Sequence, residues 1–126
     1  MHFYKYQGTG NDFVVVDDRA KTFGLDQEAI ALLCHRRFGI GADGFMLLQE
    51  AEGYDFRMVY FNSDGTEGTM CGNGGRCLVA FANQLGVIDD KTTFIATDGL
   101  HHATITENGQ VSLQMIDVPN VKITPE

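Results

Sequence analysis

The chain has 126 residues, 44% of them hydrophobic, which is enough for one compact domain with a core and too few for two ordinary domains. The formal net charge of -8 argues against a nucleic-acid partner, because affinity for phosphates comes mainly from clustered Lys and Arg. No apolar run approaches the about 20 residues that a membrane span needs, and residues 1–5 lack a signal-peptide stretch, so we expect a cytoplasmic protein without a membrane partner.

Two strands are the first elements that the sequence predicts. Apolar and polar residues alternate over 1–6, and a second apolar run covers Phe13–Val16. The glycine-rich residues 8–10 break the pattern between the two runs. We therefore expect a strand on each side of this break, with Asn11 in the connecting loop.

A helix is predicted next, over residues 27–38. Asp26 is a typical N-cap residue, and Gly39 is a typical stop signal after the last turn. Residues 35–37 (HRR) would then lie in the last turn, where the helix dipole favours positive charge. The following residues 39–44 lack the Gly-Lys-Ser/Thr ending of a phosphate-binding loop and follow a helix, so we interpret them as a connector.

Short apolar, β-favouring runs predict five further strands. They cover residues 45–48, 56–61, 93–97, 101–106 and 111–115. A turn signal at residues 62–65 (NSDG) follows the second of these strands, and Asn108-Gly109 is a strong hairpin signal before the last one. The last three strands are therefore expected to form an antiparallel meander.

The segment between Gly74 and Gly86 predicts the central element of the fold. Its residues 75–85 are apolar on nearly every face at helical spacing, which indicates a buried helix. Strands before and after a buried helix are typical of an α+β domain. We expect a mixed, largely antiparallel, barrel-like sheet wrapped around this central apolar helix, in a single domain over residues 1–126.

The start of that helix, residues 71–77 (CGNGGRC), is the best candidate for a chemical function. A helix N-terminus presents unpaired N–H groups and partial positive charge, so it would stabilise a thiolate at Cys71. The glycines leave the same N–H groups open to a carboxylate, which would spread the negative charge of a deprotonated α-carbon. Most unpaired cysteines are small buried hydrophobes, so a core position for Cys71 stays open.

Three asparagines, Asn11, Asn62 and Asn73, are predicted in loops or at strand ends. There an amide can offer both a donor and an acceptor to an amino-acid ligand. Turn formation is the commoner reason for asparagine at such places, because this residue tolerates left-handed backbone angles. From spacing alone, both interpretations stay open.

The other two cysteines, Cys34 and Cys77, lie on apolar helical stripes, and we expect both in the core. With Cys71 they make an odd number without a signal peptide, which argues against a disulfide framework. No metal site is expected either, because the sequence has no Cys-x-x-Cys and the adjacent His101 and His102 have no cysteine pair near them.

Four segments, taken together, resemble the diaminopimelate epimerase family. They are residues 5–14 (KYQGTGNDFV), 37–44 (RFGIGADG), 60–67 (YFNSDGTE) and 70–77 (MCGNGGRC), in the family's order and at its approximate spacing. A looser likeness extends through residues 97–99. Each segment alone is a weak signal, and four in order are highly specific. Thr9, Gly44 and Gly75 depart from the usual pattern, and we expect no side-chain contact with substrate at Gly44.

The resemblance implies two similar α+β halves that close on a small-molecule substrate at their interface, without pyridoxal phosphate, metal or another cofactor. One cysteine would act as thiolate base and a second as thiol acid, interconverting LL-diaminopimelate and meso-diaminopimelate for lysine and cell-wall synthesis. Cys71 matches the N-terminal member of this pair. Asn11 and Asn62 match positions that contact the substrate, and the backbone of Gly72 and Asn73 matches the anion-holding loop.

The second half of the family's fold is missing from residues 1–126. We therefore expect the N-terminal domain of a two-domain epimerase, without its C-terminal domain and its second catalytic cysteine, and inactive alone. The surface that faces the missing half would be exposed, which would allow a homodimer.

Two alternatives stay open. One is a related proline racemase-like or phenazine-biosynthesis-like isomerase, although residues 11–13 and 62–65 favour the epimerase. The other is a non-catalytic binding module that has kept the anion loop. A second domain in the same reading frame, with a cysteine at a glycine-rich helix start, would favour the enzyme.

Overall fold

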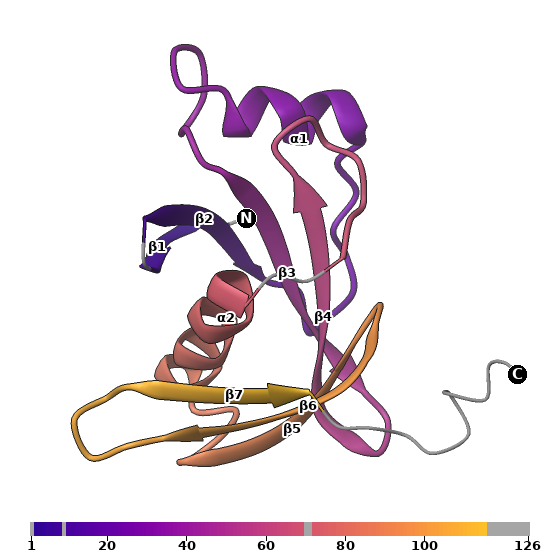
Figure 1. The fold of residues 1–126 in the computed structure, drawn as a ribbon. Coiled ribbons are helices and arrows are strands. Elements are labelled where there is room, and N and C mark those ends of the chain that lie inside the picture. The colour runs from indigo at the N-terminus through magenta and orange to yellow at the C-terminus, as the bar shows by residue number, and fades with distance from the viewer. Residues whose placement is uncertain (1, 9, 70–71, 116–126) are drawn as a thin grey trace, which may run out of the picture.

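The computed structural model describes residues 2–8, 10–69 and 72–115, which form a seven-stranded sheet and two helices (Figure 1). The strands are β1 (Tyr4–Gly8), β2 (Asn11–Asp17), β3 (Gly44–Ala51), β4 (Tyr54–Asn62), β5 (Lys91–Ala96), β6 (Gly99–Ile105) and β7 (Val111–Met115). They lie side by side in chain order, with parallel pairs at β2–β3 and β4–β5 and antiparallel pairs elsewhere. The predicted α+β class and the mixed, largely antiparallel sheet are confirmed.

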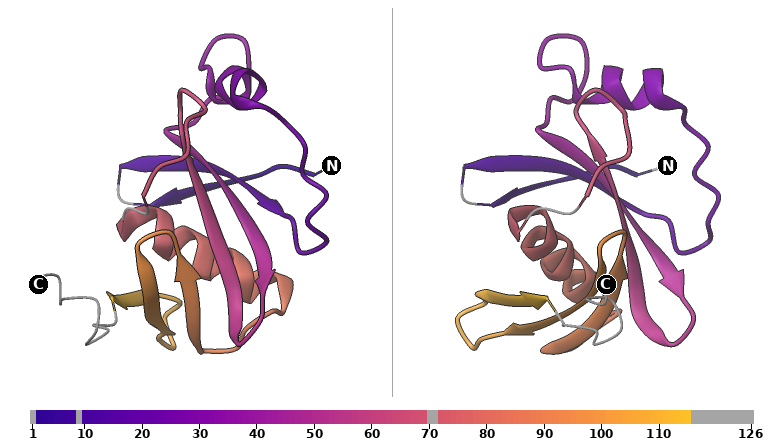
Figure 2. Two further views of the ribbon diagram at one scale, coloured as in Figure 1. Left: turned by 90° about the vertical axis from the view of Figure 1, so that its right-hand side faces the viewer. Right: turned by 45° about the vertical axis from the view of Figure 1, so that its right-hand side comes forward.

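The sheet curls into an open half-barrel around α2 (Gly72–Leu85). In Figure 2 the β1–β2 end and the β5–β7 end of the sheet lie on opposite sides of this helix, which contacts both ends as well as β3. Leu78 and Phe81 of α2 are fully buried in the core of this concave side, together with Phe56 and Phe94. Removing these apolar side chains from water is the main force that holds the helix against the sheet.

The opposite face of the sheet carries α1 (Gln27–Cys34), whose Ile30 and Cys34 pack in a second core with Val14 and Phe45. Residues of β2 and β3 therefore point alternately into two different cores. A strand that is buried on both faces reads as a continuous apolar run, as these two strands do.

Helix α2 is more polar than the sequence predicts. It begins at Gly72, directly after Cys71 and before the apolar stretch at residues 75–85, and its residues Arg76, Asn83 and Gln84 are exposed. The prediction of a central helix that is apolar on every side is therefore not confirmed. The half-barrel is open along one side (Figure 2). Neither helix in the described part of the chain has the length and apolar character for crossing a membrane.

Helix α1 ends earlier than predicted, at Cys34. His35 has extended backbone angles, so residues 35–37 lie beyond the last turn. The helix ends there because the connector folds back on it: the backbone N–H groups of Ile40 and Gly41 both donate to the carbonyl of Leu33. A Cβ on Gly39 would overlap the carbonyl oxygen of Leu32, so glycine is required at this position for close packing.

The first turn is tighter than predicted. Gly8 pairs directly with Asn11, so Asn11 is the first residue of β2 and does not lie in a loop. Gly10 has a φ of 83°, a left-handed value that favours glycine. The predicted hairpin at Asn108-Gly109 is confirmed, with a φ of 82° at Gly109 between β6 and β7.

Candidate functional site

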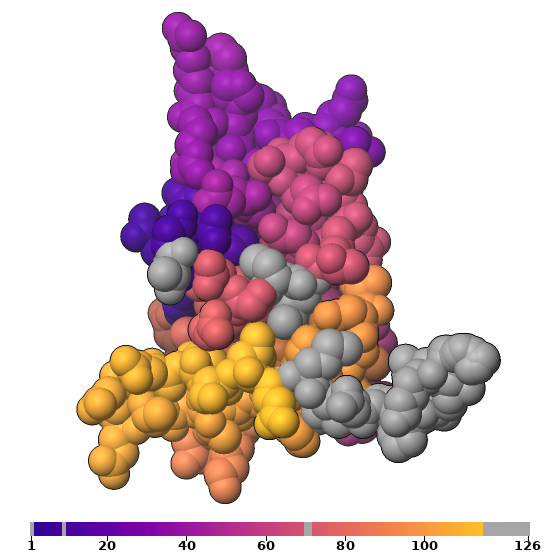
Figure 3. Space-filling view, viewed as in Figure 1, coloured from indigo at the N-terminus to yellow at the C-terminus, as the bar shows by residue number. Residues whose placement is uncertain are grey.

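Most of the predicted site residues lie at one edge of the sheet, which here means a row of strand ends and not an outer strand. The parallel strands β2 and β3 begin at this edge, and β4 ends there, because Gly44 pairs with Phe13 on one side and with Asn62 on the other. Helix α2 begins beside the same edge and reaches the surface next to the β1–β2 turn (Figure 3). This topology brings Asn11 and Asn73, which are far apart in sequence, into direct contact.

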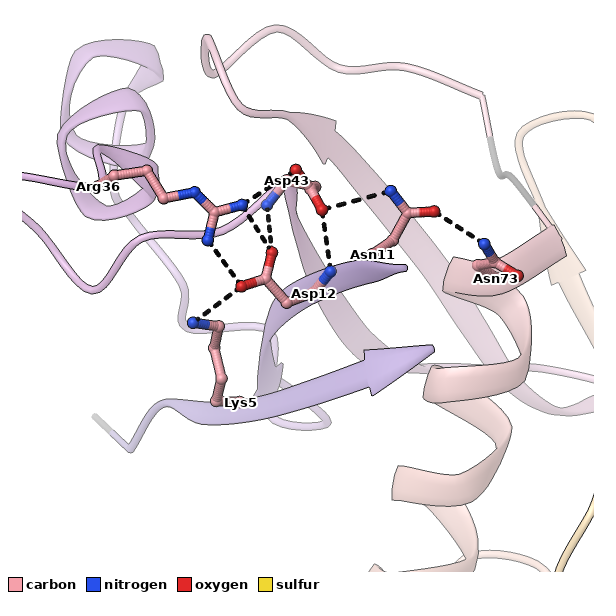
Figure 4. Close-up of polar contacts among 6 residues, drawn as sticks. All are labelled: Lys5, Asn11, Asp12, Arg36, Asp43 and Asn73. Carbon is pink, nitrogen blue, oxygen red and sulfur yellow. Dashed lines mark hydrogen bonds and ion pairs between the residues drawn. The ribbon is translucent and has the colours of Figure 1, made fainter. Parts of the chain in front are cut away.

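The amide groups of Asn11 and Asn73 are joined by a hydrogen bond. Asn73 Nδ2 donates to Asn11 Oδ1 over 2.7 Å (Figure 4). The two amides can meet because β1 packs closely against α2. A Cβ on Gly8 would lie 3.4 Å from Asn73 Cβ and 3.3 Å from Cys77 Sγ. The end of β1 therefore rests on the first turn of α2.

Asp43 fixes the direction in which the Asn11 amide points. Asn11 Nδ2 donates to Asp43 Oδ2 over 3.3 Å, and the same oxygen accepts from the backbone N–H of Asp12 over 3.0 Å. An ionised carboxylate can only accept, so the nitrogen of Asn11 must face Asp43 and its oxygen must face Asn73. Asn73 must then present its own nitrogen to Asn11.

Two cations hold the carboxylate of Asp12 at the rim of the site. Arg36 donates to its two oxygens over 2.7 and 2.8 Å, and Lys5 Nζ lies 3.1 Å from Oδ2. These bonds, above all those from Arg36, hold the pKa of Asp12 well below its ordinary value, and the pKa of Arg36 is raised in turn. Arg36 also donates to Asp43 over 3.0 Å, so the ion pairs and the asparagines form one connected network.

A polar hollow of about 320 Å³ opens beside this network. It is lined by Gln7, Gly8, Gly10, Asn11, Asp12, Arg36 and Asp43. Because its walls carry amides, carboxylates and a guanidinium, it is suited to a small zwitterionic ligand and not to an apolar one.

Asn62 lies at the same edge, but the structure does not join it to the other two asparagines. Its Nδ2 donates to Thr66 Oγ1 over 3.1 Å, and Thr66 is held in turn by Asp64. The amide is exposed and packs beside Gly68, whose added Cβ would come 2.9 Å from it. Turn formation therefore accounts for the bonds that Asn62 makes here.

Cys71, the predicted catalytic thiol, lies outside the described residues. It directly precedes Gly72, the first residue of α2, which is exposed. The first turn of a helix carries partial positive charge, and here that turn begins with Gly72 and Asn73. The described residues thus provide a helix N-terminus of the kind that stabilises anions, next to the Asn11–Asn73 bond.

The other two cysteines lie in the core, as predicted. Cys34 is 3% exposed and Cys77 is 4% exposed. Burial raises the pKa of Cys34, so its thiol stays protonated near neutral pH. Neither position is suited to proton transfer with a ligand at the sheet edge.

Four network residues were missed as site residues in the sequence: Lys5, Asp12, Arg36 and Asp43. The sequence predicts Arg36 in the last turn of a helix and Asp43 in a connector. The sequence holds a usable signal, since Asp12 lies one residue and Asp43 two residues before the apolar parts of two neighbouring strands. Recognising it required knowing that these strands are parallel and adjacent.

Comparison with known sequences gives one family. The family described as diaminopimelate epimerase matches residues 3–121. A diaminopimelate epimerase of Flavobacterium psychrophilum is 62% identical over 98% of this chain and 48% of its own length. One of Chlorobaculum tepidum is 47% identical over 86% of this chain and 43% of its own length. The chain therefore spans about half the length of these relatives.

Solved structures with a similar fold are more distant in sequence. A probable proline racemase from Agrobacterium radiobacter has a TM-score of 0.66 at 16% identity, covering 90% of this chain and 41% of its own length. A methylitaconate-delta-isomerase has a TM-score of 0.65 at 11% identity, covering 86% of this chain and 61% of its own. At these identities the likeness shows a shared fold alone.

Proposed function

We propose, because this chain belongs to the diaminopimelate epimerase family, that the complete protein interconverts LL- and meso-diaminopimelate. The observation that best supports this reaction is the hydrogen bond between Asn11 and Asn73 at the beginning of α2. It joins Asn11, which lines the small polar hollow, to Asn73 at the N-terminus of α2.

The arrangement of Asn11, Asn73 and the N-terminus of α2 suits removal of a proton next to a carboxylate. A carboxylate seated on the first N–H groups of α2 would be stabilised by their partial charge. When the α-carbon loses its proton, negative charge spreads into that carboxylate, so the same donors stabilise the developing carbanion. Amide oxygens of Asn11 or Asn62 would accept from the α-ammonium group, which fixes the α-carbon relative to the helix.

Cys71 is proposed as one acid–base group of the reaction. A thiol beside a helix N-terminus has a lowered pKa and can act as thiolate base near neutral pH. Inversion at the α-carbon requires a second group on the opposite face, and we propose a second cysteine outside residues 1–126. Neither Cys34 nor Cys77 can fill that role, since both lie in the core.

Residues 1–126 are accordingly proposed to be the N-terminal domain of a two-domain enzyme. On this proposal the isolated chain does not epimerise diaminopimelate, since both the second acid–base group and the closure that excludes water are absent. Substrate is then held between the two domains, and homodimer formation stays a separate prediction.

The test is isotope exchange at the α-carbon by the complete protein. Purified protein is incubated with LL-diaminopimelate in D₂O, and both meso product and deuterium incorporation are measured. Cys71→Ala should abolish formation of the meso isomer, whereas Cys34→Ala should retain turnover if the variant is folded. Absence of turnover by the folded wild-type protein would refute the proposed reaction. Turnover of proline instead would favour the related isomerase.

A further inference from the structure

The ring of Tyr60 lies directly over Gly44 at the candidate site. A Cβ on Gly44 would come 2.7 Å from Tyr60 Oη, 2.9 Å from Cε1 and 3.0 Å from Cζ. Any other residue at position 44 would therefore displace the end of the tyrosine ring. Glycine here leaves room for a phenol.

The strand register shows where the hydroxyl of Tyr60 is directed. Tyr60 pairs with Met46, whereas Gly44 pairs with Asn62, which is the last residue of β4. Because the ring end lies over Gly44, the side chain extends along the sheet toward the edge where Asn62 and the first residue of β2 lie. Its hydroxyl thus lies two residue pairs nearer this edge than the backbone of Tyr60.

Tyr60 packs against apolar side chains and is partly exposed. Its ring packs edge-on against Phe13, with 6.3 Å between ring centroids, and against the core of the concave side. Phe13, Gly44 and Met46 are buried, but Tyr60 is only half-buried. An apolar body in the core with a polar tip at an edge is how tyrosine contributes to binding sites.

We infer that Tyr60 is a further substrate-binding residue, whose hydroxyl contacts a charged group of the amino-acid substrate beside Asn62. This inference rests on the proposed function and adds to it a neutral group that can donate to a carboxylate or accept from an ammonium. Gly44 is the residue that makes this contact sterically accessible.

Tyr60→Phe tests the inference, since it removes the hydroxyl and keeps the ring that packs on Phe13. In the complete protein, KM for diaminopimelate should rise about ten- to a hundredfold, as expected for losing a hydrogen bond to a charged group. Tyr54→Phe is the matched control, because Tyr54 begins the same strand at its opposite end and is exposed. Its KM should equal that of the wild type. Thermal unfolding of both variants shows that each is folded.

Gly44→Ala provides an independent second variant. The added methyl displaces the hydroxyl of Tyr60, so KM should rise in the wild-type background and change little in a Tyr60→Phe background. A Tyr60→Phe protein with unchanged KM, or a loss confined to kcat, overturns the inference. These results differ from failure of the proposed function, in which the wild-type protein itself shows no turnover.

Discussion

Asn73 Nδ2 lies 2.7 Å from Asn11 Oδ1, across 62 residues of sequence. This contact joins the first strands of the sheet to the helix inside its curve. Both amides also have a defined direction, because Asp43 accepts from the other end of the Asn11 amide. The site is therefore preorganised by bonds among its own residues.

The contact predicts that Asn11 and Asn73 act as a unit. Asn11→Ala and Asn73→Ala should each lower kcat/KM for diaminopimelate by about 10- to 100-fold, the range expected for losing hydrogen bonds to charged groups. The double variant should be less impaired than the product of the two losses, with a coupling energy of about 1 kcal/mol. Steady-state kinetics of the complete protein measures kcat/KM for the two single variants and the double variant.

Asn108→Ala is the control for these asparagine variants. Asn108 lies in the turn between β6 and β7, away from the sheet edge that carries the site. Its kcat/KM should match that of the wild type. Strictly multiplicative losses at positions 11 and 73 would contradict coupling between the two amides.

The Arg36–Asp12 pair predicts a pH-dependent contribution to stability. The pKa of Asp12 is lowered in the folded protein, chiefly by hydrogen bonds from Arg36, so folding favours the ionised carboxylate. This contribution is complete above the ordinary Asp value of 3.8 and is lost as pH falls through the lower folded value. Arg36→Ala should therefore lower the melting temperature at pH 7 and differ less from the wild type below pH 3.8.

Arg37→Ala serves as the comparison for this variant. The guanidinium of Arg37 lies over the ring of Phe38, so its removal should show no such dependence on pH. Because the side chain of Arg36 is 59% exposed, added salt should also weaken its effect at pH 7. A constant difference between Arg36→Ala and wild type from pH 7 to pH 2.5 would be incompatible with the ion pair.

Substitution of Gly39 should have a large steric effect on the connector that follows α1. Gly39→Ala would drive a methyl group into the carbonyl of Leu32 and to 2.7 Å from that of Leu33, so the connector must shift away from α1. We expect a loss of about 3 kcal/mol in the free energy of unfolding, at the upper end of overpacking effects. Gly24→Ala has open space around the new methyl and should be neutral or slightly stabilising. Denaturant titration of both variants checks the contrast, and equal stabilities would refute it.

Thiol reactivity tests the proposed role of Cys71 without an activity assay. Near neutral pH, Cys71 should react with iodoacetamide faster than Cys34 or Cys77, which are almost fully buried. Peptide mapping by mass spectrometry of the folded protein, sampled over time, gives the three rates. Equal or slower labelling of Cys71 would argue against an activated thiolate.

The local pattern of the sequence predicts most of the secondary structure. All seven strands occur, because alternating or continuous apolar runs and turn signals such as Asn108-Gly109 depend on near neighbours. The two cysteines on apolar stripes are buried as expected. Asn11 and Asn73 meet at one corner, in agreement with a shared role, although no local pattern brings them together.

Errors arise where tertiary contacts override local preference. The apolar pattern and Gly39 favour a helix through residue 38, but backbone donors from residues 40–42 satisfy the last carbonyls of α1 and end it at Cys34. The ion pairs of Asp12 with Arg36 and Lys5 depend on three segments that only the fold brings together. Long-range contacts of this kind leave no periodic trace in a sequence.

The long span between Asn11 and Asn73 has a consequence for biosynthesis. Strands β1 and β2 leave the ribosome well before α2, and Tyr4 and Tyr6 cannot pack on Phe81 until that helix has been made. The β5–β7 meander, in contrast, pairs neighbours and closes only short loops. The contact between Asn11 and Asn73 therefore forms late, and a nascent chain halted before residue 73 carries only one of these two amides.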